Sequence, residues 1–314
     1  MPIKLPENLP AFDVLMRERV AVMSDDRAAK QDIRPLEIVI LNLMPEKVKT
    51  ETQFARLLGD SPIQVSLTLM QTGTYAPTHT DKTHLSSFYQ SFDALKDRRF
   101  DGLIITGAPV ETLAYEDVKY WAELKQVFDW ARSHVFSSFH VCWGAQAALY
   151  HHHGVPKHAL PEKRFGIYEH QNLHPSSDLM RGINDAFAMP VSRHTEVRQQ
   201  DLPSHLEVLA SSPEAGVGMV ADWAQREFYV FNHLEYDRET LKTEYERDLA
   251  KGASIHMPLN YFPDDNPKHS PPNMWRAFAA VVFQNWLNFV YQGTPYDLNT
   301  LNEAVHETFH KTGV

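Results

Sequence analysis

The chain has 314 residues, enough for one large domain or two modest ones, with a core that needs no cross-links. Its 30 basic and 40 acidic residues give a net charge of −10, which argues against nucleic acid or a membrane surface as the main partner. The single cysteine excludes an internal disulfide and a Cys-x-x-Cys metal pair, and it fits a reducing compartment. The N-terminus lacks a signal-peptide pattern, and polar residues interrupt the most apolar run, 277–291, so we expect a cytoplasmic protein.

The first half of the chain alternates strand-like and helix-like segments. Residues 1–34 are predicted to be an N-terminal extension with an amphipathic piece over 11–20. The predicted strands that follow are 36–43, 63–70, 101–109 and 135–142. The predicted helices between and after them are 47–58, 85–95, 115–133 and 144–153. Such alternation predicts a parallel sheet that is covered by helices on both faces.

The pattern changes after Pro156, where the segments become shorter. The predicted segments are short runs at 165–170, 186–191 and 205–210, paired strands at 216–222 and 228–231, and helices at 237–251 and 274–291. We expect one main domain over 35–295 and a C-terminal tail over 296–314.

A candidate nucleophile lies where a β-type run ends on Cys142 and the small residues Gly144 and Ala145 open a helix. This strand–turn–helix pattern is typical of a nucleophile elbow. The helix N-terminus favours the thiolate, and the N–H of Trp143 can point at an oxyanion beside the sulfur. A lone cysteine is more often a buried structural residue than a nucleophile, so the elbow alone leaves both interpretations of Cys142 open.

A second motif places His233 at the end of a strand-like run, with Glu235 two residues later. Side chains at i and i+2 of an extended chain point to the same side, so the carboxylate can hold the imidazole in one tautomer. A cysteine elbow followed by His-x-Glu is the order found in class I glutamine amidotransferase-like folds. The predicted fold is therefore α/β, a flavodoxin-like parallel sheet flanked by helices, with N- and C-terminal extensions.

A glycine turn at 106–112 follows the third predicted strand. The N–H of Gly107 or Ala108 is a candidate second oxyanion donor, and an ordinary strand-to-helix turn is the alternative.

The chain also carries three consecutive histidines, His151 to His153, which resemble a metal motif. Consecutive helical residues point in different directions, so three in a row cannot all bind one ion. Asp264 and Asp265, in a proline-containing loop, fit turn formers better than ligands. We therefore predict no metal site and no bound cofactor.

With these motifs in view, the sequence resembles the homoserine O-acyltransferase family of methionine biosynthesis. The resemblance covers nearly the whole chain, and its motifs occur in the family's order. Besides the Cys142-Trp143 elbow, they lie at 1–3, 32–36, 41–45, 100–109, 192–197, 260–263 and 285–288.

The resemblance implies a homodimer and ping-pong chemistry with acetyl-CoA as co-substrate. Cys142 matches the acylated cysteine, His233 the general base and Glu235 its carboxylate partner. The positions that contact the amino-acid acceptor match Lys163, Ser192 and Arg247, with Ser192 also bearing on the choice of acceptor.

Glu111 matches the position that selects the acyl donor in this family. Glutamate there goes with acetyl-CoA and glycine with succinyl-CoA. The physical reason is that a carboxylate in the pocket wall repels a succinyl carboxylate but leaves room for a methyl group.

Three departures from the family pattern concern the acceptor. Asn232 stands where glycine is usual, Val191 where histidine is usual, and residues 277–279 replace Ser-His-Gly. The sequence therefore predicts an O-acetyltransferase acting on homoserine, with serine as the alternative acceptor. More distant alternatives are a homoserine O-succinyltransferase, a glutamine amidotransferase or amide hydrolase, and a non-catalytic binding protein.

Overall fold

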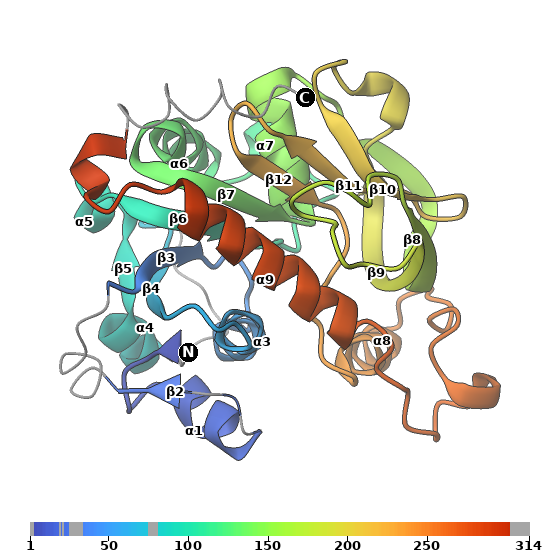
Figure 1. Cartoon of the computed structure of the whole chain (residues 1–314). Coiled ribbons are helices and arrows are strands. Elements are labelled where there is room, and N and C mark those ends of the chain that lie inside the picture. Colours follow the sequence, from blue (N-terminus) through green and yellow to red (C-terminus); the bar gives the residue numbers. More distant parts are fainter. Residues whose placement is uncertain (1–2, 19, 21, 25–33, 75–80, 302–314) are drawn as a thin grey trace.

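One continuous sheet crosses the molecule, and helices pack on both of its faces (Figure 1). This computed structural model describes residues 3–18, 20, 22–24, 34–74 and 81–301. The strands are β1 Ile3–Lys4, β2 Val22–Met23, β3 Leu36–Leu41, β4 Val65–Gln71, β5 Tyr89–Ser91, β6 Phe100–Ile105, β7 Val135–Val141, β8 His158–Asn172, β9 Ala186–Glu196, β10 Glu207–Ser212, β11 Gly216–Asp222 and β12 Glu227–Val230. The α-helices are α1 Pro10–Arg17, α3 Lys47–Gly59, α4 Lys82–Phe88, α5 Phe92–Leu95, α6 Trp121–His134, α7 Trp143–His153, α8 Thr240–Ala250 and α9 Arg276–Gly293. Short 3₁₀ turns are η1 Tyr115–Asp117, η2 Gln199–Asp201, η3 Pro263–Asp265 and η4 Leu298–Thr300.

The sheet has a parallel half and an antiparallel half that meet at β12. Its order is β2-β1-β4-β3-β6-β7-β12-β11-β10-β8-β9, with β5 paired to β4. Every pairing from β2 to β12 is parallel, and every pairing from β12 to β9 is antiparallel. The carboxyl ends of β6, β7 and β12 therefore lie side by side, which is where ligand sites of open α/β sheets occur.

The core lies on both faces of the parallel half, as near-continuous apolar strands require. On one face α3 and α9 pack against side chains such as Ile38, Ile104 and Phe139. On the other face α6 and α7 pack against Val39, Leu103 and their neighbours. The predicted α/β class and the alternation of strands and helices are thus confirmed.

The prediction of one helix over 85–95 is wrong, because the structure divides this segment into α4, β5 and α5. Tyr89 pairs with Leu69 in a parallel ladder, and its buried hydroxyl lies 2.5 Å from Glu51 Oε1 and 2.8 Å from Asn42 Nδ2. A buried hydroxyl needs such partners, and satisfying it outweighs the local helical pattern.

The predicted N-terminal extension contributes to the sheet and the core, and the predicted C-terminal tail is described only as far as residue 301. Within the predicted N-terminal extension, β1 pairs with β4 and Ile3 and Leu15 are buried. Of the predicted tail, residues 302–314 lie outside the described part of the chain. Within the described ranges, none of the helices has the length and apolar character needed to cross a membrane.

Candidate active site

Cys142 occupies the sharp turn between β7 and α7. Its φ of 51° and ψ of −117° are unusual for a residue with a side chain. The backbone N–H of Cys142 donates to Val230 O at 2.7 Å, which fixes the turn against β12. A Cβ added to Gly144 would lie 2.6 Å from Thr106 O, so only glycine lets α7 begin this close to β6. The strained turn places the sulfur at the N-terminus of a helix, and Cys142 is 6% exposed.

His233 approaches the cysteine from just beyond the end of β12. Its N–H donates to Pro190 O at 3.0 Å, which ties the segment to β9. The imidazole Nδ1 lies 2.7 Å from Glu235 Oε1, and the ring of Tyr236 stacks on the imidazole at 4.1 Å and 16°. His233 and Glu235 are both buried. The predicted contact of His233 with Glu235 is therefore present, but a turn at 234–235 forms it instead of the extended chain that the spacing suggested.

The electrostatics link these three side chains. Burial alone would lower the pKa of His233, but the negative charges of Cys142 and Glu235, with hydrogen bonds to both, raise that pKa well above its usual value. The thiol and the imidazole face the same point beside Gly107, where an added Cβ would lie 3.8 Å from Cys142 Sγ and 3.8 Å from His233 Cε1. The arrangement therefore favours the imidazolium form of His233.

The glycine turn after β6 lies beside the Cys142 sulfur, next to His233. A Cβ placed on Gly107 would lie 3.2 Å from Cys142 Cβ, 3.8 Å from its Sγ and 3.8 Å from His233 Cε1. Thr106 holds the turn, since its Oγ1 accepts from Leu43 N–H at 2.8 Å and donates to the Gly107 carbonyl at 3.0 Å. Ala108 follows and is buried. The predicted oxyanion segment thus lies directly against the sulfur.

Glu111 lies beyond this turn, partly buried and close to the other charged groups of the site. Lys157 Nζ donates to Glu111 O at 2.7 Å and so fixes the backbone of the loop. Burial raises the pKa of the Glu111 carboxyl, against the lowering effects of a backbone hydrogen bond from His194 and the charges of His233 and Lys163. The predicted donor-selecting residue therefore shares one electrostatic environment with the candidate base.

A partly buried carboxylate that sequence reasoning missed, Glu244 of α8, joins several of the predicted residues. Ser192 Oγ donates to its Oε2 at 2.6 Å, and Tyr236 OH donates to its Oε1 at 2.7 Å. Lys163 Nζ lies 3.4 Å from Glu244 Oε2 and 3.2 Å from Asp248 Oδ2. Burial would raise the pKa of Glu244, but Lys163 and the two hydroxyls outweigh burial and lower it. Lys163 and Ser192 are therefore brought together by a shared acceptor.

Arg247 lies at the margin of this cluster. Its Nε donates to Asp248 Oδ1 at 2.9 Å, and its side chain is 49% exposed. The structure thus connects Arg247 to Lys163 through Asp248 and leaves part of the guanidinium open to solvent. No local sequence signal singles out Glu244 or Asp248, because other charged residues surround both in the predicted helix.

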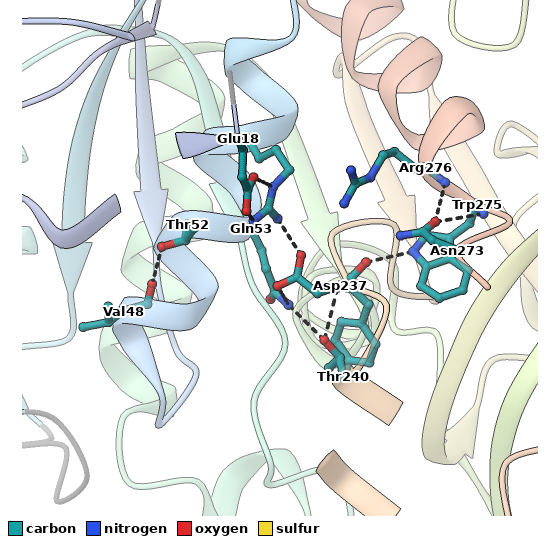
Figure 2. A network of polar contacts seen from close by, with 11 residues as sticks. Glu18, Val48, Thr52, Gln53, Asp237, Thr240, Asn273, Trp275 and Arg276 are labelled. Carbon is teal, nitrogen blue, oxygen red and sulfur yellow. Dashed lines mark hydrogen bonds and ion pairs between the residues drawn. The ribbon is translucent and has the colours of Figure 1, made fainter. Parts of the chain in front are cut away.

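The turn that follows Glu235 is anchored to α3 (Figure 2). Gln53 Nε2 donates to Asp237 Oδ2 at 3.3 Å and to Thr240 Oγ1 at 3.1 Å. Arg56 joins Asp237 Oδ1 at 2.6 Å and Glu18 Oε1 at 2.8 Å. These contacts hold the start of α8, the helix that carries Glu244, against α3.

The three departures from the family pattern lie in packed surroundings. Asn232 Oδ1 accepts from the buried Arg193 at 2.7 Å, and its Nδ2 lies 2.9 Å from His170 Nε2. Val191 is fully buried in a small apolar cluster. In the 277–279 segment, Phe278 stacks on Phe187 at 3.9 Å. These residues support the site through packing and through the buried guanidinium.

The chain was compared with known sequences and solved structures. The sequence model of the homoserine O-succinyltransferase family matches residues 2–296. A homoserine O-acetyltransferase from Acetivibrio thermocellus is 53% identical over 304 residues, which are 96% of this chain and 100% of the relative. A homoserine O-acetyltransferase from Rhizobium rhizogenes is also 53% identical, over 96% of this chain and 99% of the relative.

Among solved structures the likeness extends to the fold alone. A glutamine amidotransferase from Thermotoga maritima aligns with a TM-score of 0.51 and 10% identity, covering 82% of this chain and 99% of that chain. A glutamine amidotransferase from Methylobacillus flagellatus aligns with a TM-score of 0.51 and 11% identity, covering 82% of this chain and 95% of that chain. The predicted glutamine amidotransferase-like fold is thus confirmed, and the match over nearly the full length shows that this chain belongs to the homoserine O-succinyltransferase family of acyltransferases.

Proposed function

We propose that this protein transfers an acetyl group from acetyl-CoA to the side-chain hydroxyl of L-homoserine, a step of methionine biosynthesis, through an acyl-cysteine at Cys142. The observation that carries the proposal is the placement of Cys142 at the elbow and His233 around the same glycine turn, with Glu235 behind the imidazole. The names of the similar acetyltransferases support the same reaction. The division of labour within the site follows from its geometry.

In the first half-reaction the Cys142 thiolate attacks the carbonyl carbon of the thioester. A carbon–sulfur bond forms, and the carbonyl oxygen becomes an oxyanion beside the N–H groups of Trp143 and the Gly107 turn, with Ala108 as the further donor. The bond to the CoA sulfur then breaks, and the His233 imidazolium gives its proton to the departing thiolate. Glu235 stabilises the imidazolium until that transfer.

In the second half-reaction the now neutral His233 accepts the proton of the acceptor's hydroxyl, whose oxygen attacks the acyl carbon. Collapse of the second oxyanion breaks the bond to Cys142 and releases the ester. Lys163, Ser192 and Arg247 bind the amino-acid portion, and the exposed part of Arg247 offers two N–H groups to its carboxylate. The transfer from thioester to ester is favourable and requires no metal or redox cofactor.

Glu111 selects the acyl donor in this proposal. Its carboxyl group lies within the field of His233 and Lys163 at the wall beyond the Gly107 turn. A succinyl group would bring a second carboxylate to this wall, and like charges in a partly dry site repel strongly. An acetyl group brings none. Glu111 thereby favours acetyl-CoA over succinyl-CoA, the donor that gives the family its name.

The test measures CoA release with acetyl-CoA or succinyl-CoA, each combined with L-homoserine or L-serine. We expect turnover with acetyl-CoA and homoserine, and a Cys142 peptide whose mass rises by one acetyl group when the acceptor is omitted. Preference for serine would keep the mechanism and change the acceptor. Release of ammonia from glutamine, without dependence on CoA, would replace the proposal with an amidotransferase.

The protein is further proposed to act in the cytoplasm as a homodimer, with residues 35–295 as the acyltransferase domain. The family resemblance supports this assembly. Light scattering after gel filtration tests it, and a monomeric mass in an active sample would contradict it.

A further inference from the structure

The histidines at the end of α7 point toward three different carboxylates. The pairs join His151 Nε2 to Asp129 Oδ1 at 2.7 Å, His152 Nε2 to Glu227 Oε1 at 3.5 Å, and His153 Nε2 to Asp222 Oδ2 at 3.5 Å. This divergence agrees with the prediction that the three side chains cannot share one ion. Each histidine therefore has its own neighbouring side chains, and His153 can be considered separately from the other two.

His153 is joined by a second histidine from a distant part of the chain. Its side chain is 9% exposed, and its Nε2 has no hydrogen-bond partner among the described residues. The ring of His205, on the exposed segment before β10, lies 5.2 Å from the ring of His153. One possible ligand atom from each of His153, His205 and Asp222 lies within 4.8 Å of the other two. A buried ring nitrogen that makes no hydrogen bond, although it faces a carboxylate and another imidazole, requires an explanation.

We propose that His153, His205 and Asp222 bind one zinc ion, with water as the fourth ligand. Two imidazole nitrogens and one carboxylate oxygen form a ligand set that zinc accepts in tetrahedral geometry. The three side chains come from the end of α7, the segment before β10 and the end of β11, so the ion would link three elements.

The surroundings suit a cation at this point. Asp222 is oriented from behind, because its Oδ1 accepts from Gln225 N–H at 3.1 Å. Arg132 is the nearby positive charge, and its guanidinium makes two hydrogen bonds to Glu227, at 3.1 and 3.0 Å, so its charge is compensated.

The proposed ion is a structural link and takes no part in acyl transfer. Cys142 precedes the first residue of α7 and His153 is its last, so about 16 Å of helix separates the ion from the sulfur. The group formed by Asp129, His151 and His152 is the competing cluster. It suits a cation less well, because Asp129 is 69% exposed and already hydrogen-bonded to His151.

The experiment uses the full chain carrying Cys142→Ala, which removes the thiolate that would otherwise bind zinc. Equilibrium dialysis with Zn²⁺ measures stoichiometry and affinity, and Co²⁺ serves as a spectroscopic probe of the coordination geometry. We expect one ion per chain and the visible spectrum of a tetrahedral site. His205→Ala removes an exposed side chain and should weaken binding at least about 10-fold, and Asp222→Asn should do the same with little change of shape.

His151→Ala is the matched control, an adjacent histidine in the competing cluster, and it should leave the affinity unchanged. The melting temperature Tm should rise with zinc concentration in the parent and not in His205→Ala. The proposal is overturned if no ion binds, if His205→Ala binds zinc as tightly as the parent, or if His151→Ala is the variant that loses the ion.

Discussion

The two halves of the sheet contribute different things to the candidate site. The parallel half supplies backbone geometry: a strained turn at Cys142 and a glycine turn at Gly107, both at the carboxyl ends of neighbouring strands. The antiparallel half, with α8 against it, supplies charged and polar side chains, in which Glu244 joins Lys163 to Ser192. The difference suggests that one half handles the acyl group and the other the amino acid, and each half-reaction can be measured separately.

The largest expected effect comes from removing the sulfur at the elbow. Cys142→Ala should lower kcat at least about 10⁴-fold with every acceptor, because both half-reactions pass through the acyl-cysteine. The measurement is CoA release, with circular dichroism and Tm as controls for the fold. Appreciable turnover in a folded variant would show that the elbow of the parallel half does not carry the acyl group.

Glu235→Gln should lower kcat by about 10² to 10⁴-fold, because the amide cannot stabilise the imidazolium. Burial lowers the pKa of His233, and Cys142 and Glu235 raise it well above its usual value, so loss of the carboxylate brings it down. The imidazolium exists below the pKa of the folded state and is lost above it. The alkaline limb of kcat/KM for acetyl-CoA should therefore move to lower pH, and an unchanged limb would contradict this linkage.

Glu244→Gln separates the two halves most directly. The change removes the negative charge that orients Lys163 and accepts from Ser192 and Tyr236, so KM for the acceptor should rise by about 10- to 100-fold. The burst of CoA released in the absence of acceptor should stay near its normal size. Glu246→Gln, an exposed position on the same helix, is the control and should change neither quantity. A reduced burst in Glu244→Gln would mean that α8 also serves the first half-reaction.

The parallel half was the more predictable from the sequence, and physical reasons explain this. Buried parallel strands are continuous apolar runs, and the elbow requires a small residue at Gly144, where α7 begins close to β6, so both leave local patterns. The short spacing of His233 and Glu235 also pointed to their contact, although a turn at 234–235 and not an extended chain brings them together. Tyr89 was the exception, because its buried hydroxyl found partners distant in the sequence and broke a helix that local pattern favoured.

The antiparallel half depends on contacts between distant segments. Ser192 and Glu244 are 52 positions apart, and Arg193 and Ala215, which are hydrogen-bonded, are also far apart in sequence. Nothing in the local pattern of α8 marks Glu244 as buried, since charged residues surround it in the sequence. Lys163 and Ser192 could be named through the family resemblance, but their shared carboxylate became visible only in the folded chain.

Glu111→Gly tests whether a residue in the loop after β6, close to the charged groups of the antiparallel half, selects the acyl donor. Removing the carboxyl should lower the preference for acetyl-CoA over succinyl-CoA by about 10-fold or more, as a change in the ratio of the two kcat/KM values. Because burial raises the pKa of Glu111, its charge is lost as pH falls, and discrimination in the parent should weaken toward acid pH. Glu116→Gly, in the same loop region but exposed, is the control. An unchanged ratio in Glu111→Gly would move donor selection elsewhere.

The smallest effect is expected where α3 of the parallel half holds the start of α8. Asp237→Asn weakens the ion pair with Arg56 but keeps an acceptor for Gln53, so the free energy of unfolding should fall by about 1 kcal/mol or less. Glu244 depends on this anchor for its position, so KM for the acceptor should rise a few-fold while the CoA burst stays constant. Glu239→Gln, which weakens an exposed ion pair with Lys242, is the matched control and should leave KM unchanged. An equal rise of KM in both variants would mean that α8 responds to any loss of charge, and the contact with α3 would then have no special part in holding the acceptor side in place.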